Sequence, residues 1–367
     1  MTPLRIARVE GFAFRQPLTD PVATSFGIMR DRPAVFVRIE DAEGGFGWGE
    51  VFANWPAAGA EHRVRLLVQD VAPLLIRQAF DDPPALFRHL DAATRIRALQ
   101  CGEPGPFAQV VAGLDIAAWD LAARRRGLPL ARMLGATRDA IPCYASGIPI
   151  ARAGAMVAAA RAAGFPAAKV KVGFGPGEAA QVNRLLAEAR IAIMADANQA
   201  WEADAAADFL DAVDGLAWLE EPVIATAPDA VWARLARRGT PLAGGENLAG
   251  AQFDAAIAAG HLSVIQPDVA KWGGITGCRA VGRAAVAAGR RYCPHFLGGG
   301  IGLAASAHLL AAVGGDGLLE VDVNPNALRD AFGGDYAGRW TVPDTPGLGI
   351  ATLPEALAPF LTLHESA

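Results

Sequence analysis

Three carboxylates in the second half of the chain each follow a short apolar run, at intervals of 24 and 26 residues: Asp196, Glu220 and Glu246. Brought together, they would repel one another and raise one another's pKa unless a cation neutralised them. Oxygen ligands without a nearby Cys or His favour a hard ion, and magnesium keeps positions open for water or substrate oxygens. The pattern predicts a Mg²⁺ site; the alternative is that each carboxylate pairs with an arginine or caps a helix. Only one of Glu220 and Glu221 should face the metal, because side chains alternate along a strand.

Lys169 and Lys171 are separated by two residues, which places both ammonium groups on the same face of a strand. The apolar residues around them, Ala168, Val170 and Val172, are typical of a buried strand and argue against a pair of solvated surface lysines. Each positive charge disfavours the other, so one lysine can be neutral near neutral pH and act as a base.

His295 and Asp268 end two successive apolar runs. The aspartate could hold the imidazole in one tautomer and keep it basic, as in catalytic dyads; the alternative is a structural hydrogen bond. Glu320 ends the last run, and among so many acids it could be protonated and donate to a developing oxyanion. It could also cap a helix or form an ordinary ion pair.

Eight short β-rich runs follow Gly135, each separated from the next by about one alanine-rich helical pattern: IPCYAS, AAKVKV, IAIMADAN, WLEEP, PLAGGE, VIQPD, RYCPH and LLEVD. Eight such units in roughly 210 residues predict a (β/α)8 barrel. An open doubly wound sheet would share this alternation, but no dinucleotide fingerprint follows the first run. Since barrel strands end at one mouth, the polar strand ends should converge there.

The first part of the chain indicates a hairpin followed by helices. Apolar residues alternate at Val35, Val37 and Ile39, and the alternation resumes at residues 46–50 after a glycine turn. A helical pattern then continues to Gly127. These patterns indicate a small α+β domain.

We therefore predict three parts. Residues 1–127 form an α+β capping domain, residues 128–345 form the (β/α)-barrel, and residues 346–367 pack back on the capping domain.

Composition narrows the class of protein. The 367 residues exceed one typical domain, and a hydrophobic content of 52% with 19% charged residues is typical of a globular chain. A net charge of -5 with scattered arginines disfavours nucleic acid, and we expect no membrane span and no export signal. The four cysteines have no metal-type spacing, so we expect reduced core thiols and a cytoplasmic location.

Seven motifs together resemble the enolase superfamily, and within it the mandelate racemase subgroup, over nearly the whole chain. They are GWGE at 47–50, the helix LDIAAWDLAARRRGLPL, the Lys-x-Lys pair, DAN at Asp196, EEP at Glu220, GEN at Gly245, and PD at the end of the sixth run. The resemblance implies a modified barrel with a capping domain, symmetric homo-oligomers, and Mg²⁺ bound by Asp196, Glu220 and Glu246.

The resemblance also implies the chemistry, which is removal of the proton α to a carboxylate. Lys171 would be the base on one face, His295 with Asp268 would serve the other face, and Glu320 would be the electrophilic acid. Lys169 would help to stabilise the dianionic intermediate. Lys271 matches the opposite-face lysine of the muconate-lactonising subgroup, but with the dyad present we interpret it as supporting structure.

The reaction depends on what His295 protonates. Protonation of the opposite face of the same carbon gives a racemase or epimerase of a 2-hydroxy acid. Protonation of a β-hydroxyl gives dehydration of a sugar acid to a 2-keto-3-deoxy acid, which we favour because such dehydratases are common in the resembled subgroup. Ring opening by an aldarolactone cycloisomerase stays open, since KVKVGFG and PGLGI look like segments of those enzymes.

Specificity should come from two loops of the capping domain and from one strand end. The loop from Thr24 to Arg32 offers Arg30 for a distal carboxylate, and a second loop offers Trp55 beside Asn54. Asn198 is the candidate at the strand end. Gly298 to Gly300 would let the backbone approach a ligand, or form a plain turn.

Two hypotheses from other classes compete with this one. A phosphate-binding barrel aldolase or isomerase would suit the GGGIG segment at Gly298, but it does not explain three strand-end carboxylates. A non-catalytic sugar-acid binding protein would not need Lys171 and His295.

Overall fold

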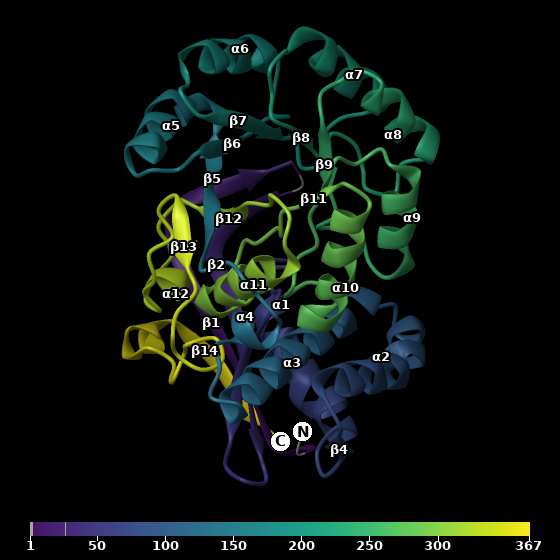
Figure 1. Ribbon diagram of the computed structural model, residues 1–367, viewed down its shortest axis with the longest axis vertical. Coiled ribbons are helices and arrows are strands. Elements are labelled where there is room, and N and C mark those ends of the chain that lie inside the picture. Colours follow the sequence, from purple (N-terminus) through teal and green to yellow (C-terminus); the bar gives the residue numbers. More distant parts are fainter. Residues whose placement is uncertain (1–2, 26) are drawn as a thin grey trace.

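Two sheets form the framework of the chain in the computed structural model, which describes residues 3–25 and 27–367 (Figure 1). One is an antiparallel sheet built from the N-terminal strands and the last strand of the chain. The other is a curved parallel sheet flanked by helices. The prediction of a (β/α)-barrel with an α+β capping domain is confirmed.

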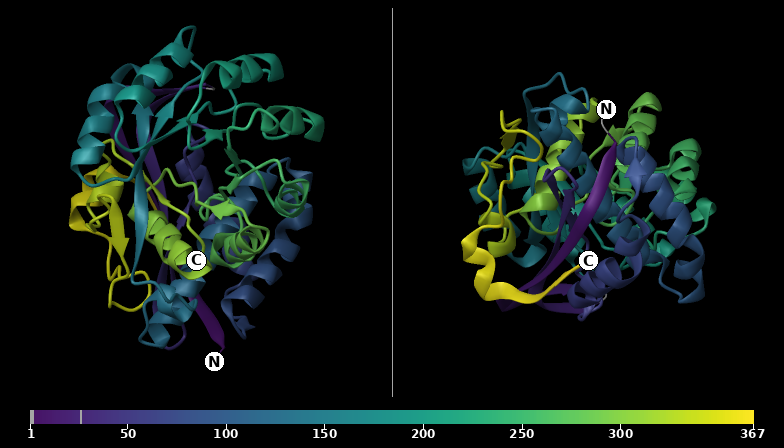
Figure 2. Two further views of the ribbon diagram at one scale, coloured as in Figure 1. Left: turned by 45° about the horizontal axis from the view of Figure 1, so that its top comes forward. Right: turned by 90° about the horizontal axis from the view of Figure 1, so that it is seen from below.

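The capping sheet has the order β14-β1-β2-β3, and β4 pairs with β1. Its strands are β1 Leu4–Thr24, β2 Gly27–Asp41, β3 Phe46–Val51, β4 Ala79–Phe80 and β14 Leu361–Ser366. The predicted hairpin is the β2–β3 pair, in which Phe36 lies opposite Glu50. Its turn is closed by Asp41, whose Oδ1 accepts from the backbone amides of Glu43 and Gly45. Both chain ends lie at this sheet, since β14 pairs antiparallel with β1 (Figure 2).

Four α-helices follow the capping strands: α1 Gly59–Arg65, α2 Pro83–Gln100, α3 Pro104–Arg125 and α4 Leu130–Met133. A π-helical turn at Leu66–Val71 and a 3-10 turn at Ala72–Leu74 join α1 to β4. Asp82 caps α2 by accepting from the amide of Ala85, and proline fills the first helical position. Helix α3 packs on β3, where a Cβ at Gly47 or Gly49 would collide with backbone carbonyl oxygens of α3. These two glycines therefore bring the β3 backbone directly onto the helix.

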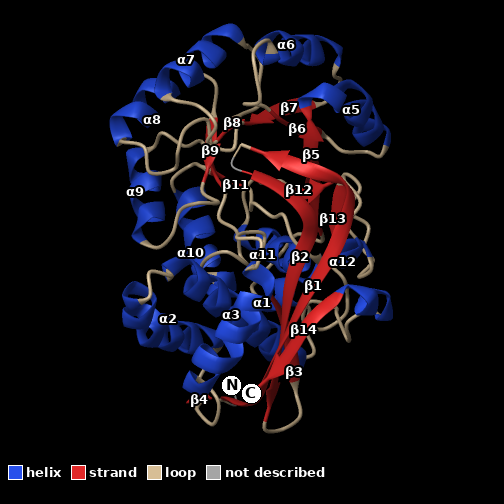
Figure 3. Ribbon diagram, turned by 180° about the vertical axis from the view of Figure 1, so that it is seen from behind, coloured by secondary structure: helices blue, strands red, loops and turns tan. Residues whose placement is uncertain are grey.

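The parallel sheet contains the eight predicted barrel strands in the order β11-β10-β9-β8-β7-β6-β5-β12 (Figure 3). They are β5 Ala140–Pro149, β6 Ala167–Lys171, β7 Ala192–Asp196, β8 Leu219–Glu220, β9 Leu242–Gly244, β10 Val264–Ile265, β11 Arg291–Tyr292 and β12 Leu319–Asp322. Within the described chain the two end strands, β11 and β12, share no ladder. Short β13, Arg339–Thr341, pairs antiparallel with β5.

Helices alternate with these strands: α5 Ala153–Ala162, α6 Glu178–Glu188, α7 Ala203–Ala212, α8 Asp229–Ala236, α9 Ala251–Ala259, α10 Gly274–Ala287 and α11 Gly300–Val313. Two short helical pieces, Ile150–Arg152 and α12 Ala327–Asp330, lie beside β5 and after β12, and a 3-10 helix at Glu355–Phe360 precedes β14. The last two long barrel helices contact the capping domain, α10 through α3 and α11 through β3. The two domains therefore meet at α10 and α11, the helices that follow Asp268 and His295 in the chain.

The expectation of a loop from Thr24 to Arg32 is wrong for most of its length. The strands β1 and β2 continue as a ladder to their tip, with Val22 opposite Met29 and Thr24 opposite Gly27. The ladder has irregularities between Ile6 and Arg8 and between Pro17 and Val22, and the second of them interrupts the strand pattern before the tip. Residue 26, within the expected loop, lies outside the described residues.

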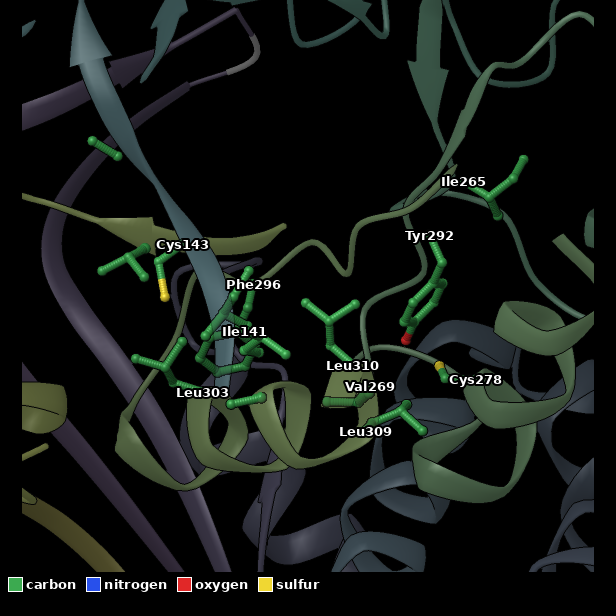
Figure 4. Packing of buried hydrophobic residues seen from close by; sticks show 14 of the residues in the cluster. Ile141, Cys143, Ile265, Val269, Cys278, Tyr292, Phe296, Leu303, Leu309 and Leu310 are labelled. Carbon is green, nitrogen blue, oxygen red and sulfur yellow. The ribbon is translucent and has the colours of Figure 1, made fainter. Parts of the chain in front are cut away.

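One large apolar cluster, part of which is drawn in Figure 4, includes barrel strands, barrel helices and residues of the capping domain. A separate small cluster of barrel-strand residues contains Tyr144, Met194 and Trp218. Cys143, Cys278 and Cys293 are buried as expected, but Cys101 is exposed at the end of α2, so the prediction of four core thiols is wrong for that residue. No helix of the described chain is long and apolar enough to cross a membrane.

Candidate active site

A cavity of about 730 Å³ lies at the C-terminal ends of the barrel strands, under the long β1–β2 hairpin. Its lining combines capping-domain residues such as Trp55 with barrel residues such as Lys171 and His295. The predicted strand ends therefore converge on one space. Some predicted residues line it directly, whereas Lys169, Asp196, Glu220 and Asp268 lie almost fully buried beneath.

The lysine side of this cavity is built from two adjacent barrel strands. Lys171 lies opposite Asp196 in the β6–β7 ladder, and its Nζ donates to Asp196 Oδ2 at 2.6 Å and to Asn198 Oδ1 at 2.7 Å. Asn198 has a positive φ of 45°, and its backbone amide donates to the other oxygen of Asp196. The parallel register thus places the ammonium group without help from any distant segment.

Lys169 is only 1% exposed, and its Nζ lies 2.6 Å from Glu220 Oε1 and 2.8 Å from Glu320 Oε1. Burial pulls its pKa down, but the carboxylates of Glu220 and Glu320 outweigh burial and raise it well above the usual value. The pKa of Lys171 is also raised, by Asp196 acting against burial and against Lys169. In this arrangement the carboxylates outnumber the ammonium groups, so their effect on the pKa outweighs the like-charge repulsion between the two lysines.

The histidine side joins two neighbouring strand ends. His295 Nδ1 lies 2.9 Å from Asp268 Oδ2, and its Nε2 lies 2.7 Å from Glu246 Oε2. Burial lowers the pKa of the imidazole, but Glu246 and Asp268 raise it further and leave it well above the usual value. These two carboxylates therefore favour the protonated imidazole, the form that a proton donor needs.

Glu320 accepts hydrogen bonds instead of donating one. Its Oε1 accepts from Ser146 Oγ at 2.5 Å and its Oε2 accepts from the backbone amide of Phe296 at 3.2 Å. Burial raises its pKa, but Lys169 and His295 pull it below the usual value. Of the roles left open for Glu320 by the sequence, this arrangement favours the ion pair, which Glu320 makes with Lys169 at 2.8 Å.

The three predicted metal-binding carboxylates are electrostatic neighbours. Burial first, then Asp196 and Glu320, raise the pKa of Glu220 to about 7 against the effect of Lys169. Glu246 likewise acts to raise the pKa of Asp196, but Lys171 and Lys169 outweigh this and burial, so that the pKa of Asp196 is lowered. Among the residues described, no three His, Cys, Asp or Glu side chains stand close enough to hold an ion as they are arranged. In this arrangement Lys169, Lys171 and His295 each contact one of these carboxylates.

The donor set nevertheless fits a hard cation. Each of Asp196, Glu220 and Glu246 offers only carboxylate oxygens, at a place where burial makes uncompensated negative charge costly. Glu221, the neighbour of Glu220, has a φ of 38° and faces away, toward the side-chain amide of Asn247. Of the two adjacent glutamates, Glu220 binds Lys169, whereas Glu221 shares Asn247 Nδ2 with Glu246.

Lys271 belongs to a supporting chain of hydrogen bonds. Its Nζ donates to Asn247 Oδ1 at 2.6 Å, and Asn247 Nδ2 donates to Glu246 Oε1 at 3.0 Å. The ammonium group also lies 5.0 Å from the centre of the Phe52 ring. These contacts orient Glu246, and they place Lys271 at the wall of the cavity.

The predicted substrate-binding residues differ in where they lie. Asn198 and Trp55 line the cavity, but Arg30 is exposed on β2 and is not part of the lining. Arg32 lines it instead: this arginine is 5% exposed, and its Nη2 lies 2.8 Å from Asp322 Oδ2. Its buried Nε has no hydrogen-bond partner among the described residues.

Two further residues of the site were not singled out from the sequence. Ser146 ends the first predicted strand and binds Glu320, and Gln266 Nε2 donates to Glu220 Oε2 at 2.7 Å. Both carry the same strand-end signal as the titratable residues. Applying that signal to every polar side chain, and not only to acids, bases and Asn198, would have found them.

The glycines after His295 pack against protein side chains. A Cβ on Gly298 would lie 2.6 Å from Glu50 Oε1, and one on Gly299 would lie 2.7 Å from the Phe36 ring. A Cβ on Gly300 would meet Phe332. The sequence suggested that a ligand could approach the backbone closely at these glycines. In the structure, side chains of the capping domain and the ring of Phe332 lie there.

Comparison with known proteins places this site in a family. Residues 152–356 match the model described as Enolase C-terminal domain-like, and residues 8–135 match the Mandelate racemase / muconate lactonizing enzyme, N-terminal domain. The chain belongs to the enolase superfamily, in its mandelate racemase subgroup. It is an enzyme of that superfamily, as the motifs indicated.

Relatives of this enolase-superfamily enzyme carry different names. The D-galactarolactone cycloisomerase of Agrobacterium fabrum is 29% identical over 97% of this chain and 99% of its own. The solved mandelate racemase/muconate lactonizing enzyme of Bordetella bronchiseptica is 49% identical, with a TM-score of 0.91 over 97% of this chain and 99% of that one. The L-talarate dehydratase of Polaromonas sp., solved with Mg and L-glucarate, is 28% identical, with a TM-score of 0.83 over 99% of both chains.

Proposed function

We propose that this enzyme removes the proton α to the carboxylate of a sugar acid and then expels the β-hydroxyl, giving a 2-keto-3-deoxy acid. The observation that carries the proposal is the pairing of two proton-transfer groups in one cavity. Lys171 is held by Asp196 on one side, and His295 is held between Asp268 and Glu246 on the other. A base and an acid in one enclosed space are what an elimination requires.

Asp196, Glu220 and Glu246 are the residues proposed to hold Mg²⁺, as their buried oxygen-only donor set suits. When bound, the ion supplies Lewis-acid polarisation of the substrate carboxylate, which acidifies the neighbouring C–H bond. The Polaromonas relative was solved with Mg in place, which supports the assignment.

The proposed proton transfers use side chains of this chain alone. In its uncharged form, Lys171 Nζ takes the α-proton, and the electron pair of the broken C–H bond forms an enediolate. Lys169, fixed by Glu220 and Glu320, provides buried positive charge beside that developing negative charge. His295 then protonates the β-oxygen, so that the C–O bond breaks, water leaves and the enol product becomes the 2-keto-3-deoxy acid.

The cavity lining favours a polyhydroxylated diacid. Arg32, Ser146 and Asn324 line it beside Lys171, and the guanidinium group of Arg32 supplies a positive charge for a distal carboxylate. A volume of about 730 Å³ accommodates a six-carbon acid. Arg32 thus takes the role first expected of Arg30.

A second candidate reaction is ring opening of an aldarolactone, in which the leaving oxygen belongs to the ring. It is favoured by the similarity to the Agrobacterium cycloisomerase, which extends over 99% of that relative. The two reactions share the α-proton step and differ in mass balance, since dehydration releases water and ring opening does not.

The test is incubation with a panel of aldonates, aldarates and aldarolactones in deuterated water with Mg²⁺, followed by NMR and mass spectrometry. We expect α-deuterium exchange together with a product lighter by one water. A product whose mass differs from that of the substrate only by incorporated deuterium would establish ring opening or epimerisation instead. Full exchange in the Lys171→Ala, His295→Ala double variant would refute both assigned groups.

Arg32→Met and Arg30→Met form a matched pair for substrate class. Loss of Arg32 should raise KM for diacids more than for monoacids, by about ten-fold or more, since a charge-assisted hydrogen bond contributes about 1.5–3 kcal/mol. The exposed Arg30 should have little effect. Equal effects on diacids and monoacids in Arg32→Met would mean that its pairing with Asp322 is structural only.

A further inference from the structure

The buried glutamate of the GWGE motif, Glu50, has no role in the proton transfers described above, although it approaches the histidine side of the site. It is 2% exposed and lies on β3 of the capping domain. Its Oε1 accepts from the backbone amide of Gly299 at 2.5 Å, and its Oε2 accepts from that of Gly302 at 2.7 Å. One capping-domain carboxylate thus holds the first turn of α11.

Helix α11 does not cap itself. Its N-cap is Gly299, which has no side chain, so the first amides of a 14-residue helix depend on an external acceptor. A carboxylate is the preferred group at this position, because the helix dipole adds positive charge to the free amides. Glu50 supplies it from a segment 249 residues away in the sequence.

The chain between His295 and this helix is only four residues long, from Phe296 to Gly299. Asn54 Nδ2 donates to the carbonyl oxygen of Leu297 at 2.9 Å, two residues before Gly299, whose amide Glu50 binds. Phe296 is buried and belongs to the apolar cluster that Figure 4 shows in part. The segment that carries the imidazole is therefore fixed at both its backbone and its side chains.

Glu50 itself is held rigidly. Gly47 and Gly49 allow the β3 backbone to rest on α3, and because side chains alternate along a strand, Glu50 points to the opposite side. Cβ atoms on Gly298 and Gly302 would crowd its carboxylate oxygens at 2.6 and 3.2 Å. The glycines on both partners thus permit a contact that a side chain would prevent.

We propose that Glu50 is a positioning residue for His295: by holding residues 299–302 it sets where the proton donor on the histidine face stands, and it leaves Lys171 on the other face untouched. This inference rests on the proposed function only for the identity of the two faces. The contact between the domains exists whichever acid is the substrate.

The test compares Glu50→Gln with Asp120→Asn. Gln keeps the shape but replaces one acceptor oxygen by an NH₂ group facing an amide donor. Asp120 is the matched control, since it is also buried and its carboxylate accepts from the amides of Trp48 and Leu348, away from the cavity. Glu50→Asp, which keeps the charge with a shorter reach, is the second variant.

Amide hydrogen exchange followed by mass spectrometry is the first measurement, and it needs no substrate. In Glu50→Gln we expect protection to fall in residues 295–302 and to stay unchanged in residues 171–178. Asp120→Asn should not produce this local pattern. Loss of protection spread evenly over the molecule would overturn the proposal.

The second measurement is α-deuterium exchange of galactarate and its α-epimer talarate, assigned to faces by the single variants Lys171→Ala and His295→Ala. The ratio of the two rates in one sample does not depend on how much protein is folded. Glu50→Gln should lower the histidine-face rate by about ten-fold or more relative to the lysine-face rate, because a displacement of about 1 Å can cost a hundred-fold. Glu50→Asp should recover part of it.

An unchanged ratio in Glu50→Gln would show that the contact is structural only and would overturn the proposal. If wild-type enzyme exchanges neither acid, the proposed function fails for these substrates, while the hydrogen-exchange result still decides the role of Glu50.

Discussion

The two faces of the active site are held by different kinds of structure. On the lysine face, Lys171 and Asp196 are partners in one parallel ladder, so neighbouring barrel strands set their distance. On the histidine face, Asp268 and His295 lie three residues beyond the ends of β10 and β11, outside the ladder. The position of Lys171 is therefore set by a strand, whereas the positions of Asp268 and His295 are set by loops.

The capping domain supplies what the ladder does not. Three consecutive contacts come from residues 50–54: Glu50 holds the start of α11, the amide of Phe52 donates to the carbonyl of Ala270, and Asn54 donates to that of Leu297. On the lysine face, by contrast, the exposed Ser25 donates to the carbonyl of Asn198. Lys171 and His295 therefore depend on the domain interface to different degrees.

Removal of the metal should affect the lysine face and the histidine face alike, because both faces act on the same acidified carbon. With a chelator we expect α-deuterium exchange on both faces to fall below detection, and readdition of Mg²⁺ to restore it. Mg²⁺ should also raise the free energy of unfolding of wild-type enzyme, by about 2.7 kcal/mol at a concentration of one hundred times Kd. Unaltered turnover and unaltered thermal unfolding after exhaustive chelation would remove the metal from the mechanism.

Single replacement of the two proton-transfer groups should separate the faces. Lys171→Ala should reduce exchange on its own face by about 10²–10⁴-fold, and His295→Ala should do the same on the other, as is usual for general acid–base groups. Two-face NMR exchange assays measure both in one sample. Equal losses on both faces in each variant would contradict the assignment of one group to each face.

The carboxylates that join the domains should give the histidine side a characteristic pH dependence of stability. Burial raises the pKa of Glu50 to about 7, against the amides of Gly302 and Gly299, and burial likewise raises to about 7 the pKa of Asp115, which lies on α3 and accepts from the amide of Thr276 at the start of α10. A raised folded pKa stabilises at low pH, and this stability is lost as the pH rises from about 4 to about 7. The difference between wild type and the Glu50→Gln, Asp115→Asn double variant should shrink by up to about 3 kcal/mol per group over that range.

Glu61 is the control for this pH effect, since its pKa is lowered to about 2 by its hydrogen bond to Arg15 against the effect of burial. Its contribution to stability is present above the usual carboxyl pKa and lost only as the pH falls toward about 2. Glu61→Gln should therefore give a constant difference from wild type between about pH 5 and 7. Urea unfolding at several pH values measures all three variants, and a rising difference for the double variant would mean that the sign is wrong.

The smallest expected effect separates the two contacts of the capping domain near the cavity. Asn54→Ala removes the hydrogen bond to Leu297 and should lower histidine-face exchange by about five-fold, the value of one hydrogen bond of about 1 kcal/mol. Ser25→Ala should change lysine-face exchange by less than about two-fold, because an exposed contact contributes little. A larger effect in Ser25→Ala than in Asn54→Ala would reverse the comparison.

Much of the fold and site could be predicted because strand ends in a barrel are periodic in the sequence. Asp196, Glu220 and Glu246 recur with the length of one unit, and all three lie at or just after the ends of β7, β8 and β9. The same periodicity placed Lys171 and His295 on one cavity. It could not locate Arg32, since residues 24–32 were expected to be a loop and are mostly strand.

Charge states could not be predicted in the same way, because they depend on which neighbours a side chain meets. Two lysines two residues apart suggested mutual repulsion, yet Lys169 and Lys171 each contact carboxylates from other strands that raise their pKa. For Glu320 the sequence left open a protonated acid or an ion pair, and in the structure Lys169 and His295 lower its pKa. The sequence of one strand does not show the charges on neighbouring strands that shift the pKa values of its side chains.

The sequence by itself determined the family, the barrel repeat and the strand-end residues, because these are local patterns repeated at fixed intervals. Only the tertiary structure decided how the histidine face is held. The GWGE motif was recognised as a motif, but nothing in the sequence says that Glu50 meets α11 across 249 residues. Such a contact depends on how two domains pack, and packing between distant segments leaves no periodic signal in the chain.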